Sequence, residues 1–178
     1  DDLRRDGPLG QGWSLPYSME LRLGSDDEGQ PVVTLIDEQG RPTVLPDIEP
    51  GTRQYSLRDG LDLCRTEGGH YFIHVPGGLF FLFEPPAEGE PRVQTLKLAR
   101  LEDRNGNFID LRHDALGRLV ELTDSTGRLL ALEYAGVGQN EVELQLKIVD
   151  LLDAGTRYIW VVRLVGPLPS HRPTATAP

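Results

Sequence analysis

The sequence predicts an all-β protein built from antiparallel hairpins. Three observations lead to this fold class. A short motif recurs at hairpin spacing, apolar and polar residues alternate after each copy, and the 178 residues include 20 Gly and 14 Pro. Glycine and proline in such numbers are typical of many short strands joined by tight turns.

The recurring motif has the form D-x-x-G followed by a strand. Residues 103–111 read DRNGNFIDL, residues 114–122 read DALGRLVEL and residues 124–132 read DSTGRLLAL, so the glycines are eleven and then ten residues apart. An earlier copy, DEQGRPTVL, occupies residues 37–45. A period this short is too small for a helical repeat and indicates a ladder of hairpins.

Each copy carries the residue types that a tight turn requires. An aspartate at the first turn position accepts a hydrogen bond from the backbone two residues on. A glycine three residues later adopts the left-handed conformation that closes a type I turn into a bulged hairpin. The predicted structural turn residues are Asp37 and Gly40, Asp103 and Gly106, Asp114 and Gly117, and Asp124 and Gly127.

The strand after each glycine alternates in one register, which predicts a continuous apolar face when the strands stack. The residues expected on this face are Ile109, Leu111, Val120, Leu122, Leu130, Leu132 and Tyr134. The opposite face is expected to be wet, with three apolar residues near the turns: Phe108, Leu119 and Leu129.

Further strands are expected on both sides of the repeats. Upstream these are residues 19–23, 32–36 and Leu61–Arg65, and a hairpin of Tyr71–Val75 with Leu79–Phe83. The run Leu79–Phe83 is continuously apolar, which predicts burial on both sides or an aromatic-rich core strand. Downstream, residues 142–148 and 158–165 are expected to form a last hairpin.

The motifs resemble those of the Rhs proteins, a family that also includes the animal teneurins. The usual repeat there is Tyr-Asp-x-x-Gly-Arg and an aliphatic residue, and HDALGRL at residues 113–119 is close to it. Residues 7–17, GPLGQGWSLPY, are similar to the G-P-L-G-x-G-W segment that opens many bacterial Rhs shells. The tyrosine before aspartate is missing from every copy, so the chain resembles a degenerate, early part of a shell covering residues 7 to about 134.

With this resemblance the chain divides into five segments. Residues 1–18 are the Rhs-type opening segment, 19–101 an antiparallel meander and 102–135 the YD-like repeats. Residues 136–165 form a further hairpin, and 166–178, rich in Pro, Thr and Ala, are expected to be disordered.

The resemblance implies a structural, non-enzymatic piece of a hollow β-cocoon that encloses a C-terminal toxin. Rhs shells are delivered between bacteria by type VI secretion or carried in insecticidal complexes, which implies a cytoplasmic stage followed by secretion or delivery into a target cell. The implied partners are other parts of the shell and the toxin, and open sheet edges favour self-association. Trp13 and Tyr17 are expected to be packing anchors.

Composition narrows the remaining function classes. A formal net charge of −10 argues against a nucleic-acid partner, because phosphate binding needs clustered Lys and Arg. No apolar run is long enough for a transmembrane helix, no signal-peptide pattern is present, and the first residue is not Met, which suggests a processed piece. The one cysteine, Cys64, cannot form an internal disulfide and is expected to be a small buried strand residue.

The sequence predicts no catalytic residue, cofactor or metal, although three groups of residues resemble parts of such sites. His70 and His74 stand four apart on one expected strand without two further ligands. Residues 103–110 carry several oxygen ligands near a glycine but lack the spacing of a calcium loop. The acidic residues Glu121 and Glu133 share an expected sheet face, where solvated carboxylates are ordinary.

A binding module for carbohydrate or protein at a cell surface is the alternative function. Trp13, Tyr71 and Phe72 could serve as stacking platforms in such a module. Exposure discriminates between the two hypotheses, because a platform needs these rings on the wet face and a shell buries them.

Overall fold

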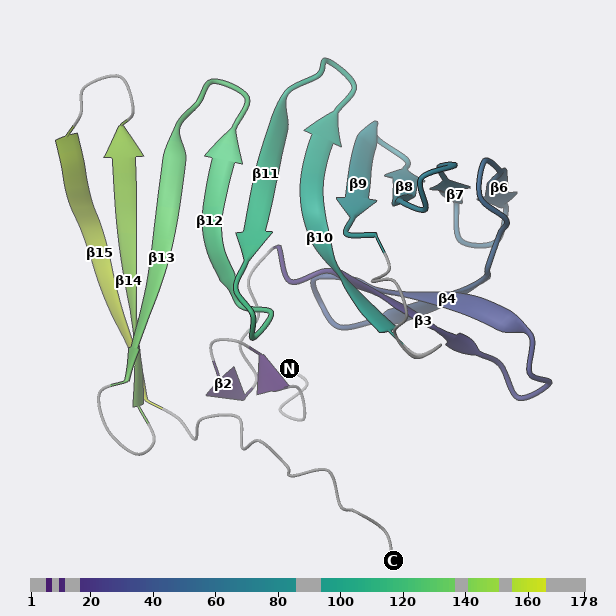
Figure 1. Ribbon diagram of the computed structural model, residues 1–178, viewed down its shortest axis with the longest axis horizontal. Helices are drawn as coiled ribbons and strands as arrows, with labels where there is room; N and C mark the ends of the chain where they lie inside the picture. Colours follow the sequence, from purple (N-terminus) through teal and green to yellow (C-terminus); the bar gives the residue numbers. More distant parts are fainter. Residues whose placement is uncertain are drawn as a thin grey trace, which may run out of the picture.

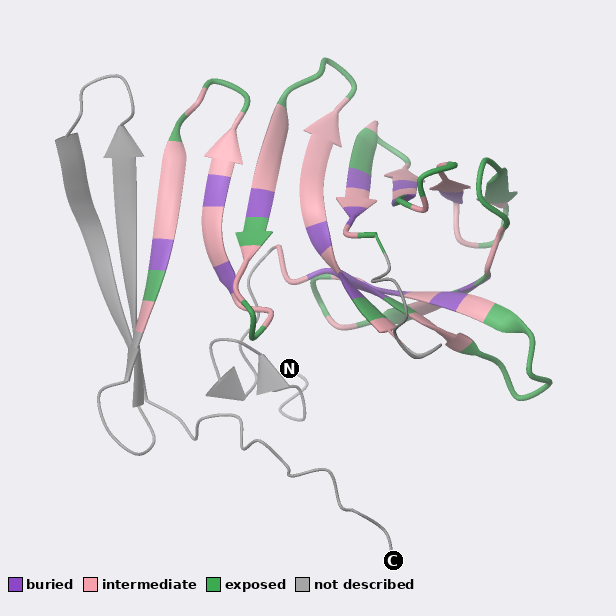
Figure 2. Cartoon of the chain, in the orientation of Figure 1, coloured by how far each residue is buried: buried purple, intermediate pink, exposed green. Residues whose placement is uncertain are grey.

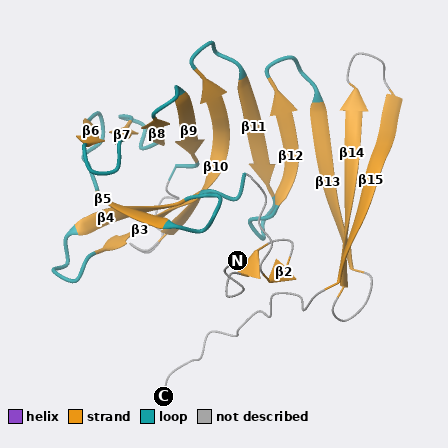
Figure 3. Cartoon of the chain, turned by 180° about the vertical axis from the view of Figure 1, so that it is seen from behind, coloured by secondary structure: helices purple, strands orange, loops and turns teal. Residues whose placement is uncertain are grey.

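The computed structural model is an antiparallel β structure. It describes residues 6–7, 10–11, 17–85, 94–136, 141–150 and 155–165, with side chains for residues 17–85 and 94–134. Every described element is a strand and every pairing is antiparallel, so the predicted fold class is confirmed (Figures 1 and 3).

Most strands lie in one sheet in the order in which they follow one another along the chain. These strands are β6 (Arg53–Ser56), β7 (Leu61–Arg65), β8 (Tyr71–Val75), β9 (Leu79–Phe83), β10 (Gln94–Asp103), β11 (Phe108–His113), β12 (Leu119–Asp124), β13 (Leu129–Gly136), β14 (Glu141–Asp150) and β15 (Gly155–Val165). Figure 1 shows them side by side in a curved row, and the turns that connect them lie alternately at the top and at the bottom of the row.

A smaller group of strands crosses one end of this row. It consists of β3 (Glu20–Ser25), β4 (Pro31–Ile36) and β5 (Pro42–Pro46). Two short strands, β1 (Asp6–Gly7) and β2 (Gly10–Gln11), pair separately.

The long strand β10 joins the two groups. Its first half pairs with β3, where Leu96 lies opposite Leu21, and its second half pairs with β9 and β11. The register shifts between Leu98 and Arg100, because a bulge turns the strand from one group to the other. The pairing of β3 with β10 spans more than seventy residues, and a simple meander does not contain it.

The core lies where the two groups face each other. Fully buried side chains come from both groups: Leu21 and Val33 from one, and Tyr71, Ile73, Phe83 and Leu98 from the other. Figure 2 shows the buried bands on β3 and β4 and on the neighbouring strands of the main row. Alternation places these residues together, since side chains two apart on a strand share a face.

The predicted apolar face of the repeats needs one correction. Leu119, expected on the wet side near a turn, is only 4% exposed and belongs to the core, whereas Val120 is only half-buried. The cause is a register shift opposite Arg112 and His113, after which Leu119 and Leu122 point to the same side. A strict period-two pattern cannot anticipate a bulge.

Three smaller expectations were tested, and two of them were wrong. In β9, Leu79 and Phe80 are exposed, so burial on both sides is excluded, but Phe81 and Phe83 are buried, as the alternative of an aromatic-rich core strand requires. Cys64 is half-buried because it faces the outer side of β7. His70 lies in the turn before β8, so it does not share a strand with the later histidine.

Candidate functional site

The D-x-x-G turns are the most regular feature of the described chain. At Asp103, one carboxylate oxygen accepts hydrogen bonds from the backbone N–H groups of Asn105 (2.7 Å) and Asn107 (3.0 Å). The N–H of Gly106 donates to the Asp103 carbonyl at 3.1 Å, and the glycine has φ +82°. One carboxylate thus holds both the turn and the residue directly before the next strand.

The same arrangement occurs at the other three predicted turns. The turn glycines are Gly40 (φ +82°), Gly117 (φ +71°) and Gly127 (φ +85°), and each donates its N–H to the carbonyl of Asp37, Asp114 or Asp124. In each, the aspartate side chain accepts from the backbone two and four residues on.

Two further turns share this arrangement but were not recognised as copies from the sequence. Asp26 and Gly29 form one between β3 and β4, where residues 24–29 are expected to form a polar turn but were not assigned to the D-x-x-G set. Thr66 and Gly69 form the other, with the threonine hydroxyl accepting from the backbone N–H of His70 at 3.0 Å. A threonine replaces the carboxylate there, so a search for aspartate alone could not find it.

The arginine after the turn glycine has a role that sequence reasoning did not assign. Arg118 donates to the second carboxylate oxygen of Asp114 at 2.8 Å, and Arg128 donates to that of Asp124 at 2.6 Å. In the first repeat, the Asn107 amide makes the equivalent contact with Asp103 at 2.8 Å. At these two turns the arginine that follows the glycine therefore holds the turn carboxylate, whereas the Arg41 guanidinium bonds to Gln39.

These contacts keep the turn carboxylates ionised. The Thr126 hydroxyl and the backbone and side chain of Arg128 lower the pKa of Asp124. The Asn107 amide lowers the pKa of Asp103. Partial burial works against ionisation at Asp114, but the hydrogen bonds from Arg118 still leave its pKa below the ordinary value.

Arg118 also connects neighbouring hairpins. Its guanidinium lies 4.7 Å from the centre of the Tyr134 ring on β13. The Tyr134 hydroxyl donates to the carbonyl of Leu119 at 2.7 Å, and burial raises the pKa of this tyrosine to about 12. The turn between β11 and β12 is therefore tied to the next hairpin by a ring and a hydrogen bond.

A buried ion pair fastens the two strand groups to each other. Glu20 on β3 is 8% exposed and accepts from Lys97 on β10 (2.8 Å) and from Arg22 (2.6 Å). Burial alone would raise the pKa of Glu20, but the two cations bring it below its usual value. A Cβ atom added to Gly117 would lie 3.2 Å from the Lys97 side chain, so this turn packs directly on the ion pair.

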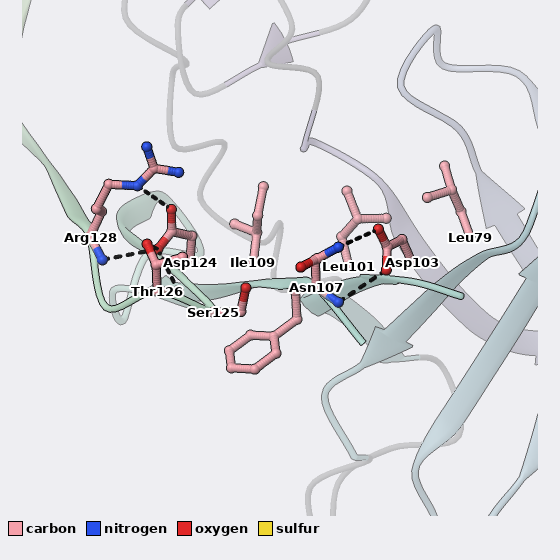
Figure 4. A pocket seen from close by; sticks show the side chains of 10 residues that line it. Leu79, Leu101, Asp103, Asn107, Ile109, Asp124, Ser125, Thr126 and Arg128 are labelled. Carbon is pink, nitrogen blue, oxygen red and sulfur yellow. Dashed lines mark hydrogen bonds and ion pairs between the residues drawn. The ribbon is translucent and has the colours of Figure 1, made fainter. Parts of the chain in front are cut away.

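A shallow groove of about 370 Å³ runs along one end of the row on the core side (Figure 4). Its apolar floor is formed by Leu79, Leu101 and Ile109. The walls are the turns at 103–107 and 124–128, whose carboxylates are already hydrogen-bonded within their own turns. The groove therefore offers an apolar surface between polar walls that are internally satisfied.

The opposite, outer face carries ion pairs between neighbouring strands. They are Arg53 with Asp62, Arg100 with Asp110 (2.5 Å) and Arg112 with Glu121 (2.7 Å). A smaller hollow of about 240 Å³ lies beside the first pair and is lined by Arg53, Asp62, Cys64, Phe72, His74 and Phe80. His74 stacks on Phe80 with ring centres 4.4 Å apart.

The aromatic residues expected to be stacking platforms or packing anchors are at least half-buried wherever the structure describes them. Tyr71 is fully buried and donates its hydroxyl to Asp47 at 2.9 Å, so it cannot serve as an exposed stacking platform. Phe72 is half-buried in the small hollow, and Tyr17 is half-buried against the core, whereas Trp13 lies outside the described residues.

The part of the chain that the structure describes holds no group of three or more His, Cys, Asp or Glu side chains suited to a metal ion. Among these residues there is also no helix with the length and apolar character needed to cross a membrane.

Comparisons with known proteins find one family model and two toxins that are similar to parts of this chain. A family model described as a domain of unknown function, DUF6531, matches residues 1–45. Double-stranded DNA deaminase toxin A of Burkholderia cenocepacia is 32% identical over 131 residues, covering 74% of this chain and 9% of that protein. Toxin protein Tse5 of Pseudomonas aeruginosa is 29% identical over 154 residues, covering 73% of this chain and 11% of that protein.

Both relatives are toxins. The chain spans about a tenth of the length of each curated relative that it matches. The similarity therefore supports a toxin-associated protein, and the matched parts are small portions of much longer chains.

Proposed function

We propose that this chain is a non-enzymatic wall segment of an Rhs-type shell that encloses a toxin. The observation that carries the proposal is the row of strands from β6 to β15, in which D-x-x-G turns join β10 to β11, β11 to β12 and β12 to β13. Its core side continues into a groove where Leu79, Leu101 and Ile109 stay accessible. A wall needs this combination of a rigid frame and an apolar inner surface.

The length relationship supports the same proposal. A chain that spans about a tenth of two longer toxins fits one section of a wall better than a complete toxin. A sheet with unpaired ends can be extended by further strands, since backbone groups on an edge strand accept another strand. In a complete shell such as those of the type VI and insecticidal-complex families, the remaining length would supply these strands and the enclosed domain.

The state of the polar groups supports a role without catalysis. A general acid needs a carboxyl group with a raised pKa. The pKa of Asp103, of Asp114 and of Asp124 is instead lowered by bonds within each turn. On the outer face, Glu121 is bound by Arg112, as expected of a structural ion pair.

The alternative of a surface-binding module is less well supported. Tyr71, one of its three proposed platforms, is buried against the core. The outer hollow at Phe72 and Phe80 keeps some aromatic surface accessible, but its acidic residue Asp62 is occupied by Arg53.

The decisive experiment is co-expression of this chain with the polypeptide encoded immediately downstream, followed by size-exclusion chromatography with light scattering. A wall segment is expected to elute with the downstream polypeptide. A chain that remains free of it would contradict the shell proposal and favour an independent binding domain.

Two matched variants locate the contact. Leu101→Lys places a charge in the apolar groove and is expected to reduce capture of the downstream polypeptide. Phe80→Lys places the same charge on the outer face of the neighbouring strand and is expected to leave capture unchanged. Equal loss from both variants would show that the groove is not the contact surface.

A further inference from the structure

Two of the edge strands of the described sheet, β5 and β6, differ in whether a further strand can be added. An edge strand presents unpaired backbone groups to the outside, and proteins block such edges with proline among other devices. In an antiparallel pair, residues alternate between bonding to the partner and pointing their backbone groups away from it. One hydrogen bond between two paired strands therefore fixes which residues of an edge strand bond to the partner and which point their backbone groups outward.

The edge of β5 is blocked. The N–H of Asp37 donates to the carbonyl of Arg41, so the residues of β5 that bond to β4 are 43 and 45. The outward residues are therefore Pro42, Val44 and Pro46. Two of these three positions have no N–H, so an incoming strand would find a single donor.

The edge of β6 is open. The N–H of Arg65 donates to the carbonyl of Thr52, so the next residues that bond to β7 are Gln54 and Ser56. Arg53 and Tyr55 therefore point their backbone N–H and carbonyl groups away from β7, and both keep a donor. β6 ends the described row of strands, as Figure 1 shows.

We propose that β6 is a docking edge for a second copy of this chain. Two β6 strands that run antiparallel about a two-fold axis at Gln54 bring Arg53 of each copy opposite Tyr55 of the other. Both pairs are then of the hydrogen-bonded type, in which the two residues exchange N–H···O=C bonds. The register is self-complementary and uses every outward backbone group of Arg53 and Tyr55.

The side chains fit the same register. Arg53 and Tyr55 lie on the outer face, since they pair with Cys64 and Asp62 on that side of β7. Tyr55 is 57% exposed, and the Arg53 side chain is 69% exposed although it bonds to Asp62. The two-fold pairing would place each tyrosine ring beside the guanidinium of the other copy, a favourable cation–π contact.

This chain already uses the arginine–aromatic contact within its own sheet. Arg65 lies 4.9 Å from the Tyr71 ring centre, and Arg100 lies 4.0 Å from that of Phe108. The contact proposed between copies repeats this arrangement across a new strand pair. Pairing through β6 leaves the groove at Leu79, Leu101 and Ile109 free, so the proposed dimer does not depend on the proposed shell function.

The test is sedimentation and light scattering of the purified chain over a wide concentration range, with proline variants at matched edges. Tyr55→Pro removes the outward donor of β6 and keeps the bonds to β7. It is expected to weaken dimerisation by about tenfold or more, because one donor is lost from each symmetric pair. Val44→Pro removes the outward donor of β5 at a residue of similar exposure (49%) and is expected to leave dimerisation unchanged.

A third variant distinguishes loss of the dimer contact from misfolding of the proline variant. Tyr55→Lys keeps the backbone donor and places a like charge opposite Arg53 of the other copy, so it is also expected to weaken the dimer. Far-ultraviolet circular dichroism checks that each variant is folded. A wild-type chain that is monomeric throughout would overturn the proposal, as would a dimer that is insensitive to both Tyr55 variants.

Discussion

Alanine substitutions at three glycines separate backbone strain from side-chain packing at the turns. Gly106 and Gly117 both have positive φ, at +82° and +71°, which an L-residue adopts at a cost of about 1–2 kcal/mol. At Gly106 an added Cβ has open space, whereas at Gly117 it would meet the Lys97 side chain at 3.2 Å. Gly24 has no positive φ and no neighbour within 4 Å, so it serves as the control.

The expected free energies follow from these contacts. Alanine also restricts the unfolded chain, which offsets about 0.5 kcal/mol, so Gly106→Ala is expected to destabilise by about 1 kcal/mol. Gly117→Ala is expected to cost about 1 kcal/mol more, because Lys97 must shift away from Glu20, which keeps Arg22 as its second partner. Gly24→Ala is expected to be neutral or slightly stabilising.

The assay is urea unfolding followed by circular dichroism, with thermal unfolding as a second readout. For a chain of this size, about 1 kcal/mol corresponds to a shift of about 2–4 °C in Tm. Equal losses at Gly106 and Gly117 would refute the coupling of this turn to the Lys97–Glu20 pair. An unchanged Gly106→Ala protein would refute the strain argument, and Gly117→Val, which is β-branched, is expected to lose solubility as well.

Three further predictions concern the charges and rings around the turns. Lys97→Met is expected to lower the free energy of unfolding in urea by about 2 kcal/mol, because it removes one partner of the buried Glu20 carboxylate. Arg22→Met should lower it by less, since the Arg22 side chain is 55% exposed. Because the pKa of Asp114 is lower in the folded chain than in the unfolded one, the ionised carboxylate stabilises the fold fully above the unfolded pKa, near pH 4. This stabilisation is lost as the pH falls further. Asp114→Asn should therefore flatten the decline of the urea midpoint at acid pH. Tyr134→Phe is expected to cost about 1 kcal/mol through loss of the bond to the Leu119 carbonyl. Because the folded pKa of Tyr134 is raised to about 12, its contribution is present below about pH 10 and disappears as the pH rises towards 12, a loss that the Phe variant should not show.

Local chemistry made the turns predictable from sequence. An aspartate, a glycine three residues on and an alternating strand are sufficient to place a bulged hairpin, because every required bond lies within five residues. The same logic places the β8–β9 hairpin, which has the expected bounds. Even the copies that were missed, at Asp26 and Thr66, follow a local rule that a broader pattern would have included.

Long-range pairing was not predictable in this way. Nothing near Gln94 indicates that the first half of β10 leaves the main row to pair with β3. That pairing buries Glu20 beside Lys97 and gives Gly117 a packing role that its own motif does not reveal. The bulge that turns Leu119 into the core has the same origin, since it depends on how β11 and β12 pair across the sheet.

The amino-acid sequence by itself determined the all-β class, the positions of the turns and the family resemblance, because these depend on spacing within a few residues. Tertiary structure decided which apolar side chains stay accessible, as at Leu79 in the groove, and which edge strand keeps its backbone donors. Burial and edge exposure depend on which strands meet, and those contacts are made by residues far apart in the chain.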